Sequence, residues 1–124
     1  MPPTPIRVLI ADDHRLFAEA LEAILAAEPE IEVVGLARNG EQAVEQSLAL
    51  KPDVILMDIA MPVVDGVEAT KRILEKQRGA CILMLTGSNS RTDVSRAREA
   101  GAAAYVTKDR IAAQLIAAIR ELAP

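Results

Sequence analysis

The sequence predicts a doubly wound α/β domain, in which helices cover both faces of a parallel five-stranded sheet. Apolar runs typical of buried strands alternate five times with segments whose apolar residues recur every three or four positions. The connections between these segments are short, and such alternation pairs the strands in parallel through right-handed crossovers. The length of 124 residues is that of a single domain.

The chain begins with a leader, residues 1–5, which contains three prolines and is expected to be flexible. Residues 6–11 form an almost unbroken apolar run, as in a strand buried on both faces. In the next segment the apolar residues recur at intervals of three and four, which indicates one face of a helix that ends by Pro29. The residues of that face are Leu16, Phe17, Ala20, Leu21, Ile24 and Leu25.

The middle of the chain repeats the order of strand and helix twice. Residues 31–37 are predicted as the second strand, and an asparagine–glycine pair opens the helix that follows. Residues 54–57 are predicted as the third strand, which ends at Asp58. A loop with proline and an aspartate–glycine pair then leads into a third helix, residues 67–74.

The last part of the chain holds a fourth strand at residues 81–85 and a short fifth strand at residues 103–107. Between them, residues 90–100 are predicted as a polar, arginine-bearing helix. The final helix is apolar around more of its circumference than one core face needs, so a homodimer contact there is one alternative. Its apolar residues are Ile111, Leu115, Ile116, Ile119 and Leu122.

Composition argues against several classes of protein. Fourteen basic and eighteen acidic residues give a net charge of −4, which leaves no basic excess for nucleic acid or anionic lipid. No apolar run approaches the ~20 residues of a membrane helix, and the leader lacks the features of a secretory signal. The single cysteine, Cys81, cannot form an internal disulfide and is expected to be a small core residue. We therefore expect a cytoplasmic domain that contacts no membrane.

Polar residues stand where the predicted strands end. Asp12 and Asp13 follow the first strand, Asp58 the third, Thr86 the fourth and Lys108 the fifth. Ligands of open α/β sheets bind at this edge, so these side chains are expected to converge. Three carboxylates so close together would raise one another's pKa unless a cation neutralised them. Oxygen ligands suit a hard divalent ion such as Mg²⁺, or Mn²⁺. A carboxylate beside such an ion can attack phosphorus, while lysine and threonine hold the phosphoryl oxygens.

Each of these residues has a simpler interpretation when taken alone. An aspartate before a helix usually caps it, and Asp58 could be an ordinary turn residue. Thr86 could be a strand residue, and Lys108 a solvated surface charge. His14, which follows the acid pair, is expected to face solvent rather than bind a metal. The occurrence of the whole set at one end of successive strands favours a common site.

At these residues the chain resembles the receiver domain of two-component response regulators. The motifs that carry the resemblance are Val8–His14, Asp53–Asp58, Met61-Pro62 with Asp65-Gly66, Leu85-Thr86-Gly87, Gly101-Ala102 and Tyr105–Lys108. The Ala-Asp-Asp-His start and the Lys-Asp pair after the last strand are similar to the NarL/FixJ (LuxR-type) branch. The resemblance implies a flavodoxin-like (βα)5 fold with strand order 2-1-3-4-5. Its architecture is a three-layer αβα sandwich, with the sheet between two layers of helices. A receiver domain would then span residues 6–124, with no effector domain in this chain.

The resemblance also implies a phosphorylation site. Asp58 would be the phosphoacceptor, taking a phosphoryl group from the phosphohistidine of a sensor histidine kinase. Asp13 would bind Mg²⁺ directly, together with Asp58 and the backbone carbonyl of Ala60. Asp12 would contribute to metal binding through water.

Three further positions match the switch of receiver domains. Thr86 and Lys108 would each bind a phosphoryl oxygen, and Tyr105 would turn inward as Thr86 moves. Asp109 follows the lysine where many receivers have a cis proline, so a cis bond does not carry over. Ala60 and Ser88, the positions two after Asp58 and Thr86, are neither acidic nor basic, so the phosphoryl lifetime is left open.

The leading interpretation is a phosphoacceptor domain that is not a turnover enzyme. It would control transcription through a helix-turn-helix domain outside this chain. DNA would be contacted only by that missing domain. A stand-alone receiver that acts by protein–protein contact is an alternative, as is a docking domain that needs no phosphorylation. An aspartyl-nucleophile phosphatase would require a second aspartate where Ala60 stands. An FMN carrier would bind phosphate after the first strand, where Asp12 and Asp13 would repel it.

Overall fold

A computed structural model describes residues 4–87 and 91–124. Strands and helices alternate throughout, with one short 3-10 helix before the last α-helix. In chain order the elements are β1 (Ile6–Ala11), α1 (Arg15–Ala26), β2 (Ile31–Ala37), α2 (Gly40–Leu50), β3 (Val54–Asp58), α3 (Gly66–Lys76), β4 (Ile82–Thr86), α4 (Arg91–Ala100), β5 (Ala104–Thr107), η1 (Lys108–Arg110) and α5 (Ile111–Leu122). Residues 1–3 of the expected leader, and Ser88, lie outside the described residues.

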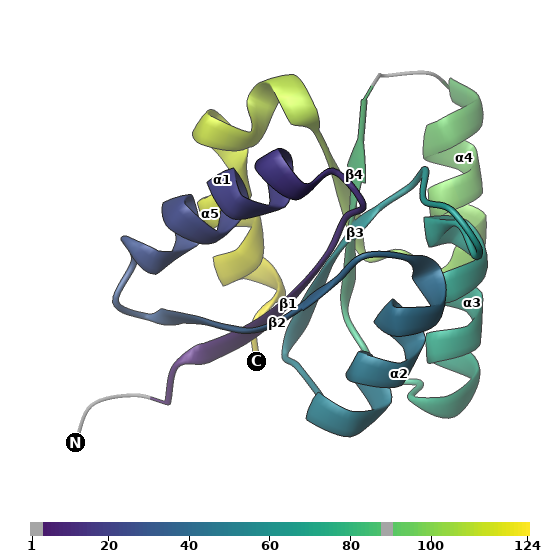
Figure 1. Cartoon of the computed structure of the whole chain (residues 1–124), viewed down its shortest axis with the longest axis horizontal. Helices are drawn as coiled ribbons and strands as arrows, with labels where there is room; N and C mark the ends of the chain where they lie inside the picture. Colours follow the sequence, from purple (N-terminus) through teal and green to yellow (C-terminus); the bar gives the residue numbers. More distant parts are fainter. Residues whose placement is uncertain (1–3, 88–90) are drawn as a thin grey trace.

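The sheet has the predicted order, β2-β1-β3-β4-β5, and every neighbouring pair of strands is parallel. Helices α1 and α5 cover one face, and α2, α3 and α4 cover the other (Figure 1). Successive strand residues point to opposite faces, so each buried strand feeds two cores. In β1, for example, Leu9 packs under α2 and α3, whereas Val8 and Ile10 pack under α1 and α5. The doubly wound prediction is therefore confirmed.

Helix α1 buries a different set of residues from the predicted face. Leu21 and Leu25 are buried as expected, but Leu16 is 82% exposed and Ile24 is 39% exposed. The six predicted residues form two stripes with a spacing of four, which lie about 100° apart around a helix. Only the stripe that contains Leu21 and Leu25 faces the sheet, and Ala18 is buried beside it. The stripe that contains Leu16 and Ile24 faces outward. Periodicity alone could not choose between two adjacent apolar stripes.

The C-terminal half shows smaller differences from the prediction. Strand β4 begins one residue later than expected, and Cys81 precedes it as a partly buried thiol whose pKa is raised by burial. Along α5, Ile116 and Leu122 pack against the core beside α1. Most of the apolar surface that suggested a homodimer is thus used within the domain. Within the described part of the chain, no helix is long and apolar enough to cross a membrane.

The loop between β3 and α3 packs closely against the end of β3. The Gly66 amide donates to the carbonyl of Ile59, and a Cβ on Gly66 would lie 2.1 Å from the carbonyl oxygen of Asp58. Only glycine fits so close an approach. Within the same loop, Val63 has φ of +68° and a side chain that is 75% exposed. A β-branched residue is strained in this left-handed region.

Replacing Val63 by asparagine is expected to stabilise the domain by about 0.5–1 kcal/mol, because asparagine tolerates positive φ without the entropy cost of glycine. Chemical denaturation measures the change in the free energy of unfolding. Val63→Ile keeps the β-branch and should leave the free energy near that of the wild type. An asparagine variant no more stable than the isoleucine variant would contradict the strain.

Candidate functional site

The sheet register brings the predicted site residues to one edge. Ala11 of β1 pairs with Met57 of β3, so the residues that follow each of them, Asp12 and Asp58, are neighbours. Further along the sheet, Thr86 at the end of β4 pairs with Thr107 of β5, directly before Lys108. The parallel order of the strands therefore places separate sequence segments side by side at their carboxyl ends. The structure brings Asp12, Asp58 and Lys108 into direct contact at this edge.

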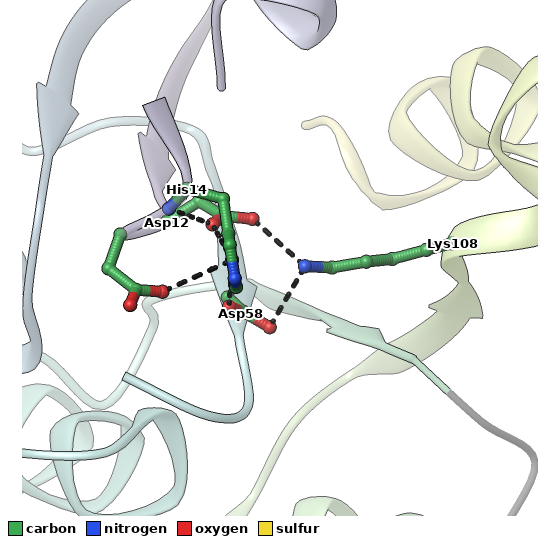
Figure 2. A network of polar contacts seen from close by, with 5 residues as sticks. Asp12, His14, Asp58 and Lys108 are labelled. Carbon is green, nitrogen blue, oxygen red and sulfur yellow. Dashed lines mark hydrogen bonds and ion pairs between the residues drawn. The ribbon is translucent and has the colours of Figure 1, made fainter. Parts of the chain in front are cut away.

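Lys108 bridges two carboxylates. Its Nζ lies 3.3 Å from Oδ2 of Asp12 and 3.4 Å from Oδ1 of Asp58. Figure 2 shows the lysine reaching across from the end of β5 with its ammonium between the two acids. Asp12 and Asp58 are both buried, whereas Asp13 is on the exposed side of the cluster. One lysine thus neutralises only part of the negative charge at this edge.

The Asp58 carboxyl group is perturbed by its surroundings. The pKa of Asp58 is raised from 3.8 to about 6, mainly by burial and also by repulsion from Asp12. The Lys108 ammonium and the Ala60 amide act in the opposite direction. The carboxyl group is therefore mostly ionised at neutral pH, but its charged form is destabilised by burial. A cation that bound here would relieve this cost.

The cluster has the chemistry of a site for a divalent cation. Oδ2 of Asp58 is buried and receives no hydrogen bond from any residue that the structure describes. Oxygen atoms of Asp12, Asp13 and Asp58 lie within 4.8 Å of one another and of a His14 ring nitrogen. A buried oxygen without a hydrogen-bond donor, beside two other carboxylates, suits an ion that takes oxygen ligands, as Mg²⁺ and Mn²⁺ do.

His14 also lies in this cluster, although the sequence predicted a solvent-facing side chain that binds no metal. Its side chain is 65% exposed, as expected, but its Nδ1 lies 3.2 Å from Oδ1 of Asp12 and 3.4 Å from Oδ1 of Asp13. The same nitrogen is 3.9 Å from Oδ2 of Asp58. The backbone amide of His14 also donates to Asp12, which turns the chain into α1 and folds the ring back over the acids (Figure 2). Its position directly after the acid pair was the available signal.

The predicted switch residues lie at different depths. Thr86 is fully buried at the end of β4, whereas Tyr105 is 41% exposed on β5. The structure therefore has the tyrosine turned outward, apart from the acidic cluster. Ala60 is exposed in the loop after β3. No cis peptide bond occurs in the described ranges, so the bond between Lys108 and Asp109 is trans.

Comparison with known proteins agrees with this geometry. The family model of the response regulator receiver domain matches residues 8–120. The transcriptional regulatory protein DegU of Brevibacillus brevis is 42% identical over 118 residues, which is 95% of this chain and 50% of that protein. A protein-glutamate methylesterase/protein-glutamine glutaminase of Pseudomonas putida is 41% identical over 106 residues, which is 84% of this chain and 28% of that protein.

A solved structure of a two-component response regulator of the LuxR family, from Aurantimonas, superposes with a TM-score of 0.91. It is 31% identical in sequence, and the match covers 96% of this chain and 85% of that one. The chain spans about half the length of the transcriptional regulators that it resembles.

Proposed function

Because this chain belongs to the response regulator receiver domain family, we propose that Asp58 is the residue that accepts its phosphoryl group from a sensor histidine kinase. The observation that carries this proposal is the state of the Asp58 carboxylate. It is buried at the carboxyl edge of the sheet, in contact with Lys108, and one of its oxygens has no hydrogen-bond donor among the described residues. A carboxylate held in this way is available as a nucleophile.

The proposed metal ligands are Asp13, Asp58 and the backbone carbonyl of Ala60, with Asp12 acting through water. Their support is the convergence of the carboxylates on one point at the edge of the sheet. A bound Mg²⁺ or Mn²⁺ would offset the repulsion between the Asp58 carboxylate and an incoming phosphoryl group. The direct contact of Asp12 with Lys108 and with the His14 amide fits its less direct role.

In the proposed reaction, a carboxylate oxygen of Asp58 forms a bond to phosphorus, and the bond from phosphorus to the donor breaks. The donor's nitrogen or oxygen leaves with the electron pair of that bond. Lys108 and Thr86 hold the equatorial phosphoryl oxygens, where negative charge must be stabilised. Lys108 already lies against Asp58, and Thr86 ends the neighbouring strand. One acyl phosphate forms on Asp58, and the dephosphorylated donor leaves.

The proposed switch follows from the new dianionic group. Thr86 moves toward the phosphoryl group, and the outward-facing Tyr105 turns into the space that it leaves. Partners would then read the face that this switch orders. The proposed output is transcription through a helix-turn-helix domain beyond this chain, which would also make any contact with DNA. Its support is that a relative twice as long is named a transcriptional regulatory protein. A cytoplasmic location is a further part of this proposal. A homodimer stays an alternative, because Ile116 and Leu122 of α5 pack within the domain.

Turnover catalysis is the competing function. A phosphatase of the aspartyl-nucleophile class needs a general acid two residues after the nucleophile, and this chain has Ala60 there. The methylesterase relative matches this chain over only 28% of its own length. We therefore propose a signalling domain that catalyses its own phosphorylation, not a turnover enzyme.

The test is the intact mass of the domain after incubation with acetyl phosphate. With Mg²⁺ or Mn²⁺ we expect a gain of about 80 Da, one phosphoryl group, and no gain in EDTA. Asp58→Asn should abolish the gain. Asp53→Asn, at the other end of β3, is the matched control and should keep it. A wild type that gains no mass, or an Asp58→Asn variant that still does, would overturn the proposal.

A further inference from the structure

The Lys108 ammonium lies over an aromatic ring, in addition to its contacts with two carboxylates. Its Nζ lies 4.3 Å from the centroid of the Phe17 ring, in the first turn of α1. The ring is partly buried and packs against the core between the sheet and the pair α1 and α5. Aromatic faces attract cations at this distance. We propose that Phe17 is a positioning residue, which holds the Lys108 ammonium in place for phosphoryl transfer to Asp58; this inference rests on the function proposed above.

Lys108 needs such a neighbour because its side chain is long and 23% exposed. An ammonium on a flexible four-carbon stem can turn outward to water, and both of its carboxylate contacts are longer than 3.2 Å. The Phe17 ring restricts this freedom without accepting a conventional hydrogen bond. The N–H donors of the lysine therefore remain available for Asp12, Asp58 and an incoming phosphoryl oxygen. A carbonyl or carboxylate in place of the ring would compete for those donors.

The alternative is that Phe17 only fills the core. Leucine would then serve nearly as well, since hydrophobic residues of similar shape exchange at modest cost. A positioning role requires the ring itself, because only the ring face attracts the cation. Phe17→Leu removes the ring and keeps an apolar side chain, whereas Phe17→Tyr keeps the ring. This pair of variants separates the two interpretations.

The first measurement is the NMR spectrum of the lysine ε-methylene groups in the metal-free domain, with the Lys108 signal assigned by its loss in Lys108→Met. A ring beside the ammonium should shift this signal upfield in the wild type and in Phe17→Tyr. The shift should disappear in Phe17→Leu. An unshifted signal in the wild type, or a shift that persists in Phe17→Leu, would overturn the proposal.

The second measurement is the rate at which acetyl phosphate phosphorylates Asp58 at saturating Mg²⁺. We expect Phe17→Leu to be about three- to tenfold slower than the wild type, and Phe17→Tyr to recover most of that rate. In a Lys108→Met background, Phe17→Leu should cause no further loss. If Phe17→Leu and Phe17→Tyr slow phosphorylation equally, Phe17 only fills the core. The same holds if Phe17→Leu slows phosphorylation by the same factor in the Lys108→Met background as in the wild type.

The two proposals fail in different ways. If the wild type is never phosphorylated, the proposed function is wrong, and the upfield shift of the Lys108 signal still decides whether the ring holds the ammonium. If the wild type is phosphorylated and Phe17→Leu matches its rate, the positioning role is wrong and the proposed function stands.

Discussion

Replacing Lys108 by methionine is expected to slow the proposed phosphorylation of Asp58 by acetyl phosphate about 100-fold. Loss of one preorganised donor to a developing negative charge typically has an effect of this size. The Lys108 ammonium lies 3.4 Å from Oδ1 of Asp58, and methionine keeps the length and apolar stem of lysine without the charge. The rate is measured by intact mass over time, at a Mg²⁺ concentration that saturates each variant.

Binding of Mg²⁺ should not be weakened by the same change, which distinguishes this role from metal binding. The ammonium lies 3.3 Å and 3.4 Å from two of the carboxylates, so its removal leaves more negative charge to attract a cation. Titration calorimetry should therefore show an affinity for Mg²⁺ that is unchanged or higher in Lys108→Met. Lys71→Met, on the exposed side of α3, is the control and should leave both quantities unchanged. A Lys108→Met rate within twofold of the wild type would contradict the assigned role.

Replacing Asp58 by asparagine is expected to stabilise the metal-free domain at pH 7.5 by on the order of 2 kcal/mol. Burial raises the pKa of Asp58 to about 6 in the folded state, against 3.8 ordinarily. The folded state therefore binds this proton more tightly than the unfolded state does. As pH rises from about 4 to 6, ionisation of Asp58 lowers the free energy of unfolding of the wild type. Asparagine is not ionised and avoids this loss.

The pH dependence is the sharper part of this prediction. The advantage of Asp58→Asn should be smallest near pH 4, grow as pH rises through 6, and be nearly complete by about pH 7. Denaturation in EDTA at several pH values measures it, with Glu22→Gln, at an exposed site on α1, as the control for loss of a carboxylate. Adding Mg²⁺ should stabilise the wild type more than Asp58→Asn, because a ligand that binds the folded state stabilises it. A pH-independent advantage would show that burial of the Asp58 charge is not its cause.

Much of this architecture could be predicted from local patterns. The strand β3 is apolar at every position before Asp58, as a strand covered on both faces must be. Asn39 and Asp65 accept hydrogen bonds from the backbone amides of Gln42 and Glu68, and so cap the helices that they were expected to open. These features depend on neighbours within a few residues, and such neighbours are visible in the sequence.

Other features depend on how the elements are oriented against one another. The sequence showed two apolar stripes on α1, and only packing on the sheet decided that Leu16 faces outward. It also showed Phe17 as a core residue and Lys108 as a possible phosphoryl contact, without any sign that the two meet. The position of His14 directly after the acid pair was a sequence signal, but it did not show whether the ring lies in solvent or over the acids.

By itself, the sequence determined the alternation of elements, the parallel sheet and the set of polar residues at its carboxyl edge. The reason is that hydrophobic period and helix caps are local, and parallel strands must end at the same edge. Only the tertiary structure decided the depth of Asp58, the reach of Lys108 between two acids and the ring that lies beside its ammonium. Those quantities come from the distances between side chains that are far apart in the chain, and such distances are set when the helices dock on the sheet.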